Sequence, residues 1–317
     1  MGVAVTPAEV ATSVSSFAAE VGPTDPVAVV GGRTHWEVGG RCEDGTRLVS
    51  APTGVRSFDP ADMTIRVGAG TPVSELDAVL AEVGQRANLP VVPNATVGGV
   101  LAVGHDDLFA LGRGRLRDTL LEAVYVNDDG DVVTAGGPTV KNVSGFDLCR
   151  LLVGSLGTLG LLAEVILRTW PRAATEQWLA GPADPVELRR RLFAPTCILW
   201  NGHTVWVHLE GHEDDVEAEA RRARSLGCER VDGPPPVPRY RRVATALSPE
   251  ELAPEKPPAD GQLGEYLVQV GTGWAYGDHP APPPDPDPAV VALHRRLKAA
   301  FDPRGRLNPG RDPLEVT

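Results

Sequence analysis

The chain opens with apolar residues at helical spacing. Val10, Val14, Phe17 and Val21 recur every three or four positions, which places them on one face of a helix. The residues just before them, Thr6-Pro7-Ala8-Glu9, form a capping box with proline at the first helical position. This pattern predicts an amphipathic helix that begins after Thr6 and ends near Val21.

Short apolar runs follow, and turn-forming residues end them. Val27–Val30 is rich in valine and stops at Gly31-Gly32, and the runs Leu48–Ala51 and Thr64–Val67 predict two more strands. From Val73 to Gly84 the apolar positions share one helical face and a glycine closes the pattern. The first 100 residues therefore predict small α/β units.

The next segment predicts a hairpin, a short helix and a long strand. Asp128-Asp129-Gly130-Asp131 separates the strand-like runs Leu120–Val126 and Val132–Thr134, which is a strong hairpin signal. Leu148–Val153 has a helical pattern, and Leu161–Thr169 predicts a strand that ends at Trp170-Pro171. The end of the first domain is expected there.

Beyond residue 172 the pattern predicts a smaller β/α module. Two strands, Cys197–Trp200 and His203–Glu210, flank Asn201-Gly202, which is typical of a two-residue type I′ turn, and a helix is expected over Asp214–Leu226. Prolines are dense between Pro234 and Pro288, so that stretch is expected to be mostly loop, with one strand at Glu265–Val270. Helical spacing returns over Val290–Phe301.

Composition narrows the class of protein. A length of 317 residues allows roughly two domains of about 150 residues each. The formal net charge of −12 argues against a main role in binding nucleic acid or an anionic membrane surface, since both need a basic face. No stretch approaches the ~18 apolar residues of a membrane span, and the N-terminus lacks the pattern of a signal peptide. The expected location is the cytoplasm.

The four cysteines give no sign of a metal cluster or a disulfide framework. Cys42, Cys149, Cys197 and Cys228 lie far apart, with no C-x-x-C spacing that could hold zinc or an iron–sulfur cluster locally. One-electron carriers would therefore have to lie on another protein.

Glycine-rich segments are the strongest candidates for a binding site. The common nucleotide motifs are missing, because Gly68-Ala69-Gly70 lacks the third glycine of G-x-G-x-x-G and no G-x-x-x-x-G-K-[ST] occurs. Instead there are three clusters, within Gly31–Gly40, Thr96–Gly99 and Gly154–Gly160. Glycine lets backbone N–H groups approach an anion such as a pyrophosphate, although tight turns between strands also use glycine.

The clusters occur together with further motifs in the order of one family. These motifs are Arg117-Asp118, the segment Val140–Leu148 with sequence VKNVSGFDL, and Asn308-Pro309-Gly310-Arg311. In this combination the chain resembles the FAD-linked oxidases of the vanillyl-alcohol-oxidase type, and within them the FAD-binding subunits of bacterial glycolate oxidases. The resemblance covers most of the chain from about Val27.

This resemblance implies an α+β fold with three parts. Residues 1–172 would form a PCMH-type FAD-binding domain of two α/β subdomains. Residues 173–289 would form a small α/β cap domain on the substrate side, including the proline-rich loop. Residues 290–317 would return to the FAD domain.

The resemblance also implies how FAD is bound. The first cluster would bind the pyrophosphate through its amides, the second would lie along the flavin and ribityl chain, and the third would line the dinucleotide from the other side. Arg117 and Asp118, with Lys141–Asp147, would brace the site. The implied cofactor-binding residues are Gly31, Gly32, Arg33, Thr34, His35, Gly40, Thr96, Gly98, Gly99, Arg117, Asp118, Gly154, Ser155, Gly157 and Gly160.

Two residues depart from the family pattern, and a histidine raises the question of a covalent flavin. Arg33 replaces a glycine or small residue in the first loop, and Phe146 replaces a tyrosine. His35 follows the paired glycines as the flavin-linking histidine does in some relatives, but its register to Gly40 fits the noncovalent branch. FAD is therefore expected to bind noncovalently.

No catalytic base or metal site stands out. Oxidation by a flavin usually needs a base for the hydroxyl proton, and His279, in a proline-rich loop, is the only histidine that could be considered. His208 and His212 flank Glu210, but they fall at a predicted strand end and turn and are expected to be exposed polar residues. The histidine-rich metal motif of the larger relatives is absent, so no metal site is predicted and the catalytic residues stay unassigned.

These observations leave three hypotheses. The first is a flavoprotein subunit of a complex that oxidises glycolate or another small 2-hydroxy acid, together with a second FAD-linked oxidase subunit and an iron–sulfur subunit. Such partners could hold the chain peripherally at the inner membrane. The second is a stand-alone FAD-dependent alcohol oxidoreductase. The third is a structural subunit with weak or no FAD binding.

Overall fold

The protein forms two compact units in the computed structural model, which describes residues 7–138, 147–243, 266–279 and 286–315. Unit 1 comprises residues up to 107, 115–172 and 286–316, so the C-terminal segment belongs to it. Unit 2 comprises residues 108–114 and 173–285. The short segment 108–114 is thus separated from the rest of unit 2 by almost 60 residues of unit 1 sequence.

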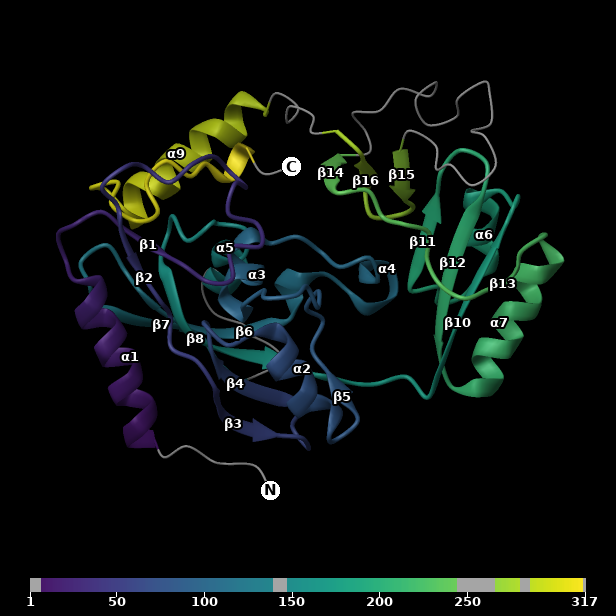
Figure 1. Cartoon of the computed structure of the whole chain (residues 1–317), viewed down its shortest axis with the longest axis horizontal. Helices are drawn as coiled ribbons and strands as arrows, with labels where there is room; N and C mark the ends of the chain where they lie inside the picture. Colours follow the sequence, from purple (N-terminus) through teal and green to yellow (C-terminus); the bar gives the residue numbers. More distant parts are fainter. Residues whose placement is uncertain (1–6, 139–146, 244–265, 280–285, 316–317) are drawn as a thin grey trace. The chain divides into compact units, whose positions relative to one another are not determined.

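Unit 1 is built on a five-stranded antiparallel sheet (Figure 1). Its order is β3-β4-β8-β6-β7, and two small two-stranded sheets, β1-β2 and β5-β9, complete the unit. The strands are β1 (Val27–Val29), β2 (Arg47–Val49), β3 (Val55–Asp59), β4 (Thr64–Gly68), β5 (Gln85–Arg86), β6 (Leu120–Val126), β7 (Val132–Gly136), β8 (Leu161–Arg168) and β9 (Trp170–Pro171).

Helices cover this sheet. Helix α1 packs against β2, β7 and β8, α3 packs against β8, and α5 packs against β6 and β7. The helices of unit 1 are α1 (Pro7–Val21), α2 (Val73–Ala81), α3 (Val97–Val103), the 3₁₀ turn η1 (Leu116–Asp118), α5 (Leu148–Leu152), α9 (Pro288–Phe301) and the 3₁₀ turn η3 (Pro313–Glu315). Neither α9 nor η3 has a buried residue.

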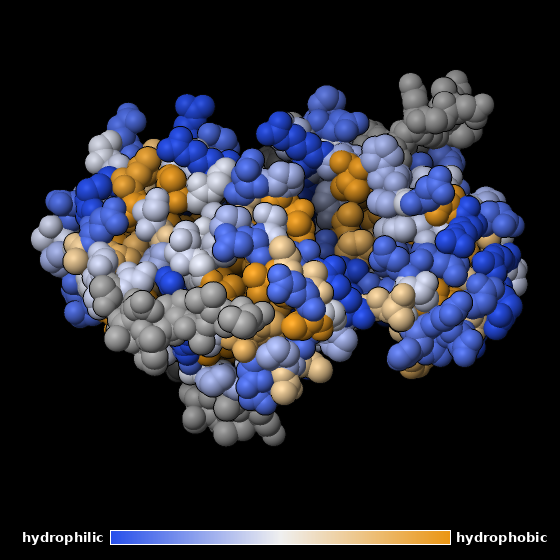
Figure 2. Space-filling model, turned by 60° about the horizontal axis from the view of Figure 1, so that its bottom comes forward, coloured by the Kyte–Doolittle hydropathy of each residue, from blue (hydrophilic) through white to orange (hydrophobic). Residues whose placement is uncertain are grey.

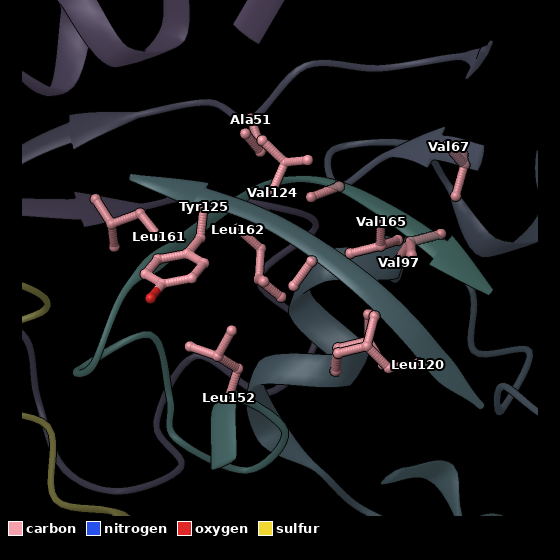
Figure 3. Close-up of a cluster of buried hydrophobic side chains, with 14 of the residues drawn as sticks. Ala51, Val67, Val97, Leu120, Val124, Tyr125, Leu152, Leu161, Leu162 and Val165 are labelled. Carbon is pink, nitrogen blue, oxygen red and sulfur yellow. The ribbon is translucent and has the colours of Figure 1, made fainter. Parts of the chain in front are cut away.

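The core of unit 1 lies between the sheet and the helices. Figure 3 shows side chains from β6 and β8 packed with Val97 of α3 and Leu152 of α5. Strand β8 is buried on both faces over seven of its eight residues, which makes it the central strand in packing as well as in sheet order. Burial of such branched side chains stabilises a fold by about 1.5–3 kcal/mol each.

A buried network of charges lies on the α1 side of the sheet. Arg66 of β4 donates to Glu164 at 2.8 Å and to Glu122 at 2.7 Å. Arg56 lies 3.5 Å from Glu164 and donates to Ser13 of α1 at 3.0 Å. Glu164 is 1% exposed, so its charge depends on the two guanidinium groups.

Unit 2 is a seven-stranded antiparallel sheet with the order β13-β10-β12-β11-β15-β16-β14. Helix α7 packs against β10 and β12, while α6 and α4 pack against β11 (Figure 1). Its elements are α4 (Ala110–Arg113), β10 (Thr175–Gly181), α6 (Pro185–Arg191), β11 (Cys197–Trp200), β12 (Val205–Gly211), α7 (Glu213–Ser225), β13 (Glu229–Val231), β14 (Tyr240–Val243), β15 (Tyr266–Gln269) and β16 (Trp274–Gly277).

The predicted α+β class is confirmed, and so are most of the predicted elements. The helix after residue 6, the strands near residues 27, 64, 120, 132 and 161, the helices of residues 73, 148, 214 and 290, and the hairpin at residues 128–131 all form. The capping residue Thr6 lies outside the described residues.

Three expectations about local structure were wrong. The β11–β12 connection is a four-residue loop, because Trp200 pairs with Val205, and Asn201 Oδ1 accepts from the amides of His203 and Thr204. The proline-rich stretch contributes β14 and β16, which pair with each other across the sheet edge. The strand expected at Leu48–Ala51 is one residue earlier and shorter, and pairs in parallel with β1.

His208 is not the exposed polar residue that the sequence suggested. It lies inside β12 and is 1% exposed, whereas His212 precedes α7 and is exposed. Burial lowers the pKa of His208, which favours the neutral imidazole. The predicted strand His203–Glu210 already contained His208, so the error was to treat His208 as part of an exposed strand end rather than as a buried residue within the strand, which runs from Val205 to Gly211.

The surface is mainly hydrophilic. Figure 2 shows one face, on which apolar residues form small groups between charged ones. Large apolar side chains that are exposed among the described residues include Val91 and Phe193. No helix within the described ranges has both the length and the apolar composition to cross a bilayer.

The charge network predicts a large effect of a single buried substitution. Glu164→Gln keeps the volume but removes the carboxylate partner of Arg56 and leaves Arg66 paired with Glu122 alone, so we expect a loss of about 3–5 kcal/mol in the free energy of unfolding, measured by urea denaturation. The control is Glu82→Gln on the exposed C-terminal end of α2, where a change within about 0.5 kcal/mol is expected. A loss below about 1 kcal/mol for Glu164→Gln would contradict the role of the network.

Candidate functional site: a cofactor-binding groove in unit 1

The three glycine clusters come together on unit 1 although their residues are up to 129 positions apart in sequence, from Gly31 to Gly160. Two adjoining pockets share Gly31, Thr96, Gly99 and Asn308 among their lining residues. The first pocket is further lined by Gly98, Ser155, Gly157 and Gly160, and the second by Gly32, Arg33, Thr34 and His35. The two pockets together form one groove, here called the glycine groove.

The amides of the first loop are available to a ligand. Residues 31–35 follow β1, are exposed, and within the described residues their backbone N–H groups donate no hydrogen bond. The loop then turns back, with the Val38 and Gly40 amides bonded to His35 and Glu37 carbonyls. A run of free amides on a sharply turning backbone suits an anion such as a phosphate.

Glycine at position 32 is required by the protein itself. A Cβ at Gly32 would lie 1.5 Å from the carbonyl oxygen of Asn94, and one at Gly31 would lie 2.3 Å from Thr96 Oγ1. The loop therefore packs directly on the segment before α3. A side chain at Gly32 would displace the backbone at Asn94 before it reached the space of a ligand. The sequence instead suggested that these glycines allow backbone amides to approach an anion.

Left-handed backbone is concentrated around the groove. Arg33, Asn94, Leu156 and Asn308 have φ of 55°, 63°, 53° and 44°, and Met63 is the one other non-glycine residue of this kind among the described residues. Such conformations cost about 1–3 kcal/mol each and persist where the surrounding structure holds them. Arg33 thus has a left-handed conformation that a glycine would adopt without steric cost.

The groove is positively charged within an acidic protein. Arg33 and Arg311 line it, whereas no aspartate or glutamate is among the described residues that line either pocket. Both guanidinium groups lie against the ring of Trp36, at 5.4 Å and 4.7 Å from its centroid. For a chain of net charge −12, this local excess of positive charge selects for an anionic ligand.

The second cluster begins helix α3. Thr96 is its N-cap and accepts from the Gly99 amide at 3.2 Å. The Gly98 amide donates to Ala69 at 2.7 Å, and a Cβ at Gly98 would meet Ala69 at 2.8 Å. Thr96, Gly98 and Gly99 thus present a flat backbone surface to the groove.

The third cluster is held by its own hydroxyl groups. Ser155 is buried, donates to Leu152 at 2.7 Å and accepts from the Gly157 amide at 3.3 Å. A Cβ at Gly160 would lie 2.4 Å from the ring of Tyr125. Gly154 has a φ of 81°, and its amide donates to the carbonyl oxygen of Leu101 in α3. Ser155 therefore shapes the loop, and the glycines allow its close approach to the core.

The C-terminal segment completes the groove. The Asn308 amide nitrogen Nδ2 donates to Leu156 at 2.7 Å, and its backbone N–H donates to Val27 of β1 at 2.8 Å. Arg311 donates to the carbonyl oxygens of Val38 and Gly40, the former at 3.0 Å. Residues 308–311 thereby join the first and third glycine clusters.

His35 lies at the mouth of the groove. Its Nδ1 is 3.2 Å from Thr34 Oγ1, and its ring lies edge-on to that of His105, with the ring centroids 5.7 Å apart. Partial burial lowers the pKa of His35, so the imidazole is neutral near pH 7. The positive charge of the groove therefore comes from the two arginines.

Arg117 and Asp118 lie elsewhere. Asp118 of η1 pairs with Arg150 at 2.6 Å, and Arg150 also lies 3.2 Å from Asp147, the N-cap of α5. Neither residue 117 nor residue 118 lines the glycine groove. Residues Lys141–Phe146 lie outside the described residues, whereas Asp147 is described.

Sequence reasoning did not name several lining residues. Trp36, Ala69, Leu161 and Leu162 line the groove, as do Asn308 and Arg311, which were noted as a closing motif without a site role. Asn94 has a left-handed backbone, and its carbonyl oxygen packs against Gly32 of the first loop. The one sequence signal for this role was an isolated asparagine before the second glycine cluster, because asparagine adopts the left-handed conformation more readily than most residues.

Comparison with known proteins agrees with this geometry. A family model described as "FAD binding domain" matches residues 3–136, and one described as "FAD linked oxidases, C-terminal domain" matches residues 285–311. These two matches contain the first two glycine clusters and the closing segment Asn308–Arg311. They lie in the two outer parts of the sequence that unit 1 brings together.

Relatives match the chain over different lengths. Glycolate oxidase subunit GlcE of Escherichia coli is 27% identical over 92% of this chain and 93% of its own length. D-lactate dehydrogenase of Archaeoglobus fulgidus is 29% identical over 64% of this chain and 52% of its own length. Glycolate oxidase subunit GlcD of Bacillus subtilis is 33% identical over 42% of this chain and 29% of its own length.

Solved structures show the same fold. An alkyldihydroxyacetonephosphate synthase structure superposes with a TM-score of 0.65 at 14% identity, covering 96% of this chain and 74% of that one. The positive charge of the glycine groove, the two family models and the relatives all point to the same cofactor. The chain is similar to the FAD-linked oxidases in both outer parts of its sequence and has an α+β fold of the PCMH type, and its cofactor is FAD.

Proposed function

We propose that the chain is a noncovalent flavoprotein subunit of a complex that oxidises a small 2-hydroxy acid of the glycolate type. The observation that carries the proposal is the glycine groove, where free amides and two arginines face a pocket with no carboxylate among its described lining residues. The similarity to GlcE over nearly the full length of both chains supports the choice of a complex.

The residues of the groove fit the parts of FAD. The amides of residues 31–35, with Arg33 and Arg311, would hold the pyrophosphate, because they supply donors and positive charge together. The surface of Thr96, Gly98 and Gly99 with Gly157 and Gly160 is uncharged and would hold the flatter, less charged parts of the cofactor. The bound flavin would supply the capacity to accept a hydride.

The described residues that line this groove include no evident base. His35 is the one histidine that lines it among the described residues, and its Nδ1 lies within hydrogen-bond distance of Thr34. A base must reach the proton it removes, at about 2.6–3.2 Å or through one water. We therefore infer that a second FAD-linked oxidase subunit oxidises the substrate and that an iron–sulfur subunit carries the electrons onward.

The cofactor and its linkage are tested by one measurement. The purified protein is expected to show flavin absorption, and acid precipitation is expected to release all of the FAD into the supernatant, because no bond to His35 forms. Flavin that stays in the pellet after washing would show a covalent link. A protein that is colourless as purified and binds no added FAD would support a structural subunit instead.

Arg311 is expected to contribute strongly to FAD affinity. Arg311→Ala removes a guanidinium group that lines the pocket and bonds to the first loop, so we expect the Kd for FAD to rise about 10–100-fold, which is about 1.4–2.8 kcal/mol. The Kd is measured by fluorescence titration of the apoprotein with FAD. Arg41→Ala, whose side chain is 91% exposed on the same loop, is the matched control and is expected to change Kd less than twofold. Equal effects of both variants would refute the specific role of Arg311.

The isolated chain is expected to be nearly inactive. We expect turnover of glycolate and D-lactate with an artificial electron acceptor to appear only when the second flavoprotein subunit and the iron–sulfur subunit are added. Turnover by the isolated chain at about 1 s⁻¹ or more, as ordinary enzymes reach, would favour the stand-alone oxidoreductase. FAD binding without activity in any mixture would leave the cofactor assignment intact and refute the complex.

A further inference from the structure

Three metal-ligating side chains meet on one face of unit 2. Glu176 of β10 is directly opposite Glu210 of β12, and His208 lies two residues before Glu210 on the same face. One ligand atom of each of the three residues lies within 4.8 Å of the others. Like charges that face each other across a strand pair are destabilising, and a bound cation would offset the charge of Glu176, since Arg113 pairs with Glu210.

Thr196 contacts His208 at two atoms. Its Oγ1 lies 3.2 Å from the His208 carbonyl oxygen and 2.6 Å from Nδ1, and when its single hydroxyl proton is donated to the carbonyl, Nδ1–H is the donor to Oγ1. The neutral ring then carries its lone pair on Nε2. Metal-binding histidines are typically oriented in this way, with the other ring nitrogen bonded to a neighbouring group.

The Nε2 lone pair of His208 is aimed at the two carboxylates. Nε2 is buried and makes no hydrogen bond within the described structure, although Glu176 Oε2 is 3.4 Å away. The ring is held between Phe109 and Trp178, each with its centroid 4.8 Å from that of His208. A rigid, buried lone pair beside a carboxylate is unfavourable unless a cation lies between them.

Glu210 is already oriented by a second group. Arg113 of α4 donates to both of its oxygens, with Nε 3.0 Å from Oε1 and Nη2 2.5 Å from Oε2. A carboxylate has about four lone-pair sites, so it can ligate an ion while it accepts from an arginine. Glu176, in contrast, has a 67% exposed side chain and leaves a route from solvent to the buried His208.

We propose that Glu176, His208 and Glu210 bind a divalent transition-metal ion of the Zn²⁺ type. One imidazole nitrogen and two carboxylates are a donor set that suits zinc, with water in the remaining position. The separation of 3.4 Å between Nε2 and Glu176 Oε2 equals the edge of a tetrahedron with bonds of about 2.0–2.1 Å. The ion would cross-link β10 and β12 and offset the paired negative charges.

The test uses the full chain, freed of metal by a chelator that is then removed. Titration with Zn²⁺ in a calorimeter is expected to show one ion per chain with a Kd of about 10 μM or tighter, and the ion is expected to raise the melting temperature. Co²⁺ in place of Zn²⁺ is expected to give visible absorption bands of a four- or five-coordinate ion. These readouts do not depend on FAD or on turnover.

Variants locate the ion. Glu176→Gln changes an exposed side chain and is expected to weaken Zn²⁺ binding about tenfold or more without lowering the melting temperature of the metal-free protein. His208→Gln is expected to abolish the Co²⁺ bands. His212→Ala removes an exposed histidine just beyond the cluster and, as the matched control, is expected to bind Zn²⁺ like the wild type.

Two results would overturn the proposal. The first is the absence of Zn²⁺ binding below about 1 mM, in which case a proton on His208 satisfies the two carboxylates. The second is unchanged binding by both Glu176→Gln and His208→Gln, which would place the ion at another site. Because Glu176→Gln is on the surface, misfolding does not obscure either result.

Discussion

The hydrogen bonds of residues Asp302–Arg311, which end in the closing segment Asn308–Arg311, hold the glycine groove in its shape. Arg306 is 2% exposed and donates to four backbone carbonyls, at Val21, Gly22, Asp25 and Asp128, which anchors the segment beside β1. Val27 then pairs with Leu307, so the segment continues the small β1-β2 sheet. Asn308 and Arg311 reach the two glycine loops only because this anchor is in place.

The same constraint explains where the backbone is strained. Asn308 and Leu156 are both left-handed and are joined by a hydrogen bond, and Gly157 has no room for a Cβ because Asn308 lies 2.2 Å from that position. Three loops that approach this closely exclude side chains, so their amides and carbonyls form the surface. The result is a groove that recognises an anion through backbone donors and two arginines, within a protein of net charge −12.

Unit 2 contains a cluster of two glutamates and a buried histidine, in which the two carboxylate charges lie close together. Its sheet places two glutamates opposite each other and buries a histidine beside them, while Arg113 neutralises only one carboxylate. Arg113 comes from the short segment 108–114, which interrupts unit 1 in sequence. The chain thus uses a distant part of its sequence to stabilise unit 2, as it uses its C-terminal segment to complete unit 1.

The sequence by itself determined the main strands and helices and the three glycine clusters, because periodicity and glycine spacing are local properties, and its resemblance to a known family implied the α+β class of fold. It did not predict β3, β10, β14 or β16, since short strands with polar residues are stabilised by their neighbours in the sheet. Only the tertiary structure decided that Gly32 faces Asn94, that Arg311 reaches the first loop and that His208 is buried between Phe109 and Trp178. These features depend on contacts between residues far apart in the chain, and no local pattern records such contacts.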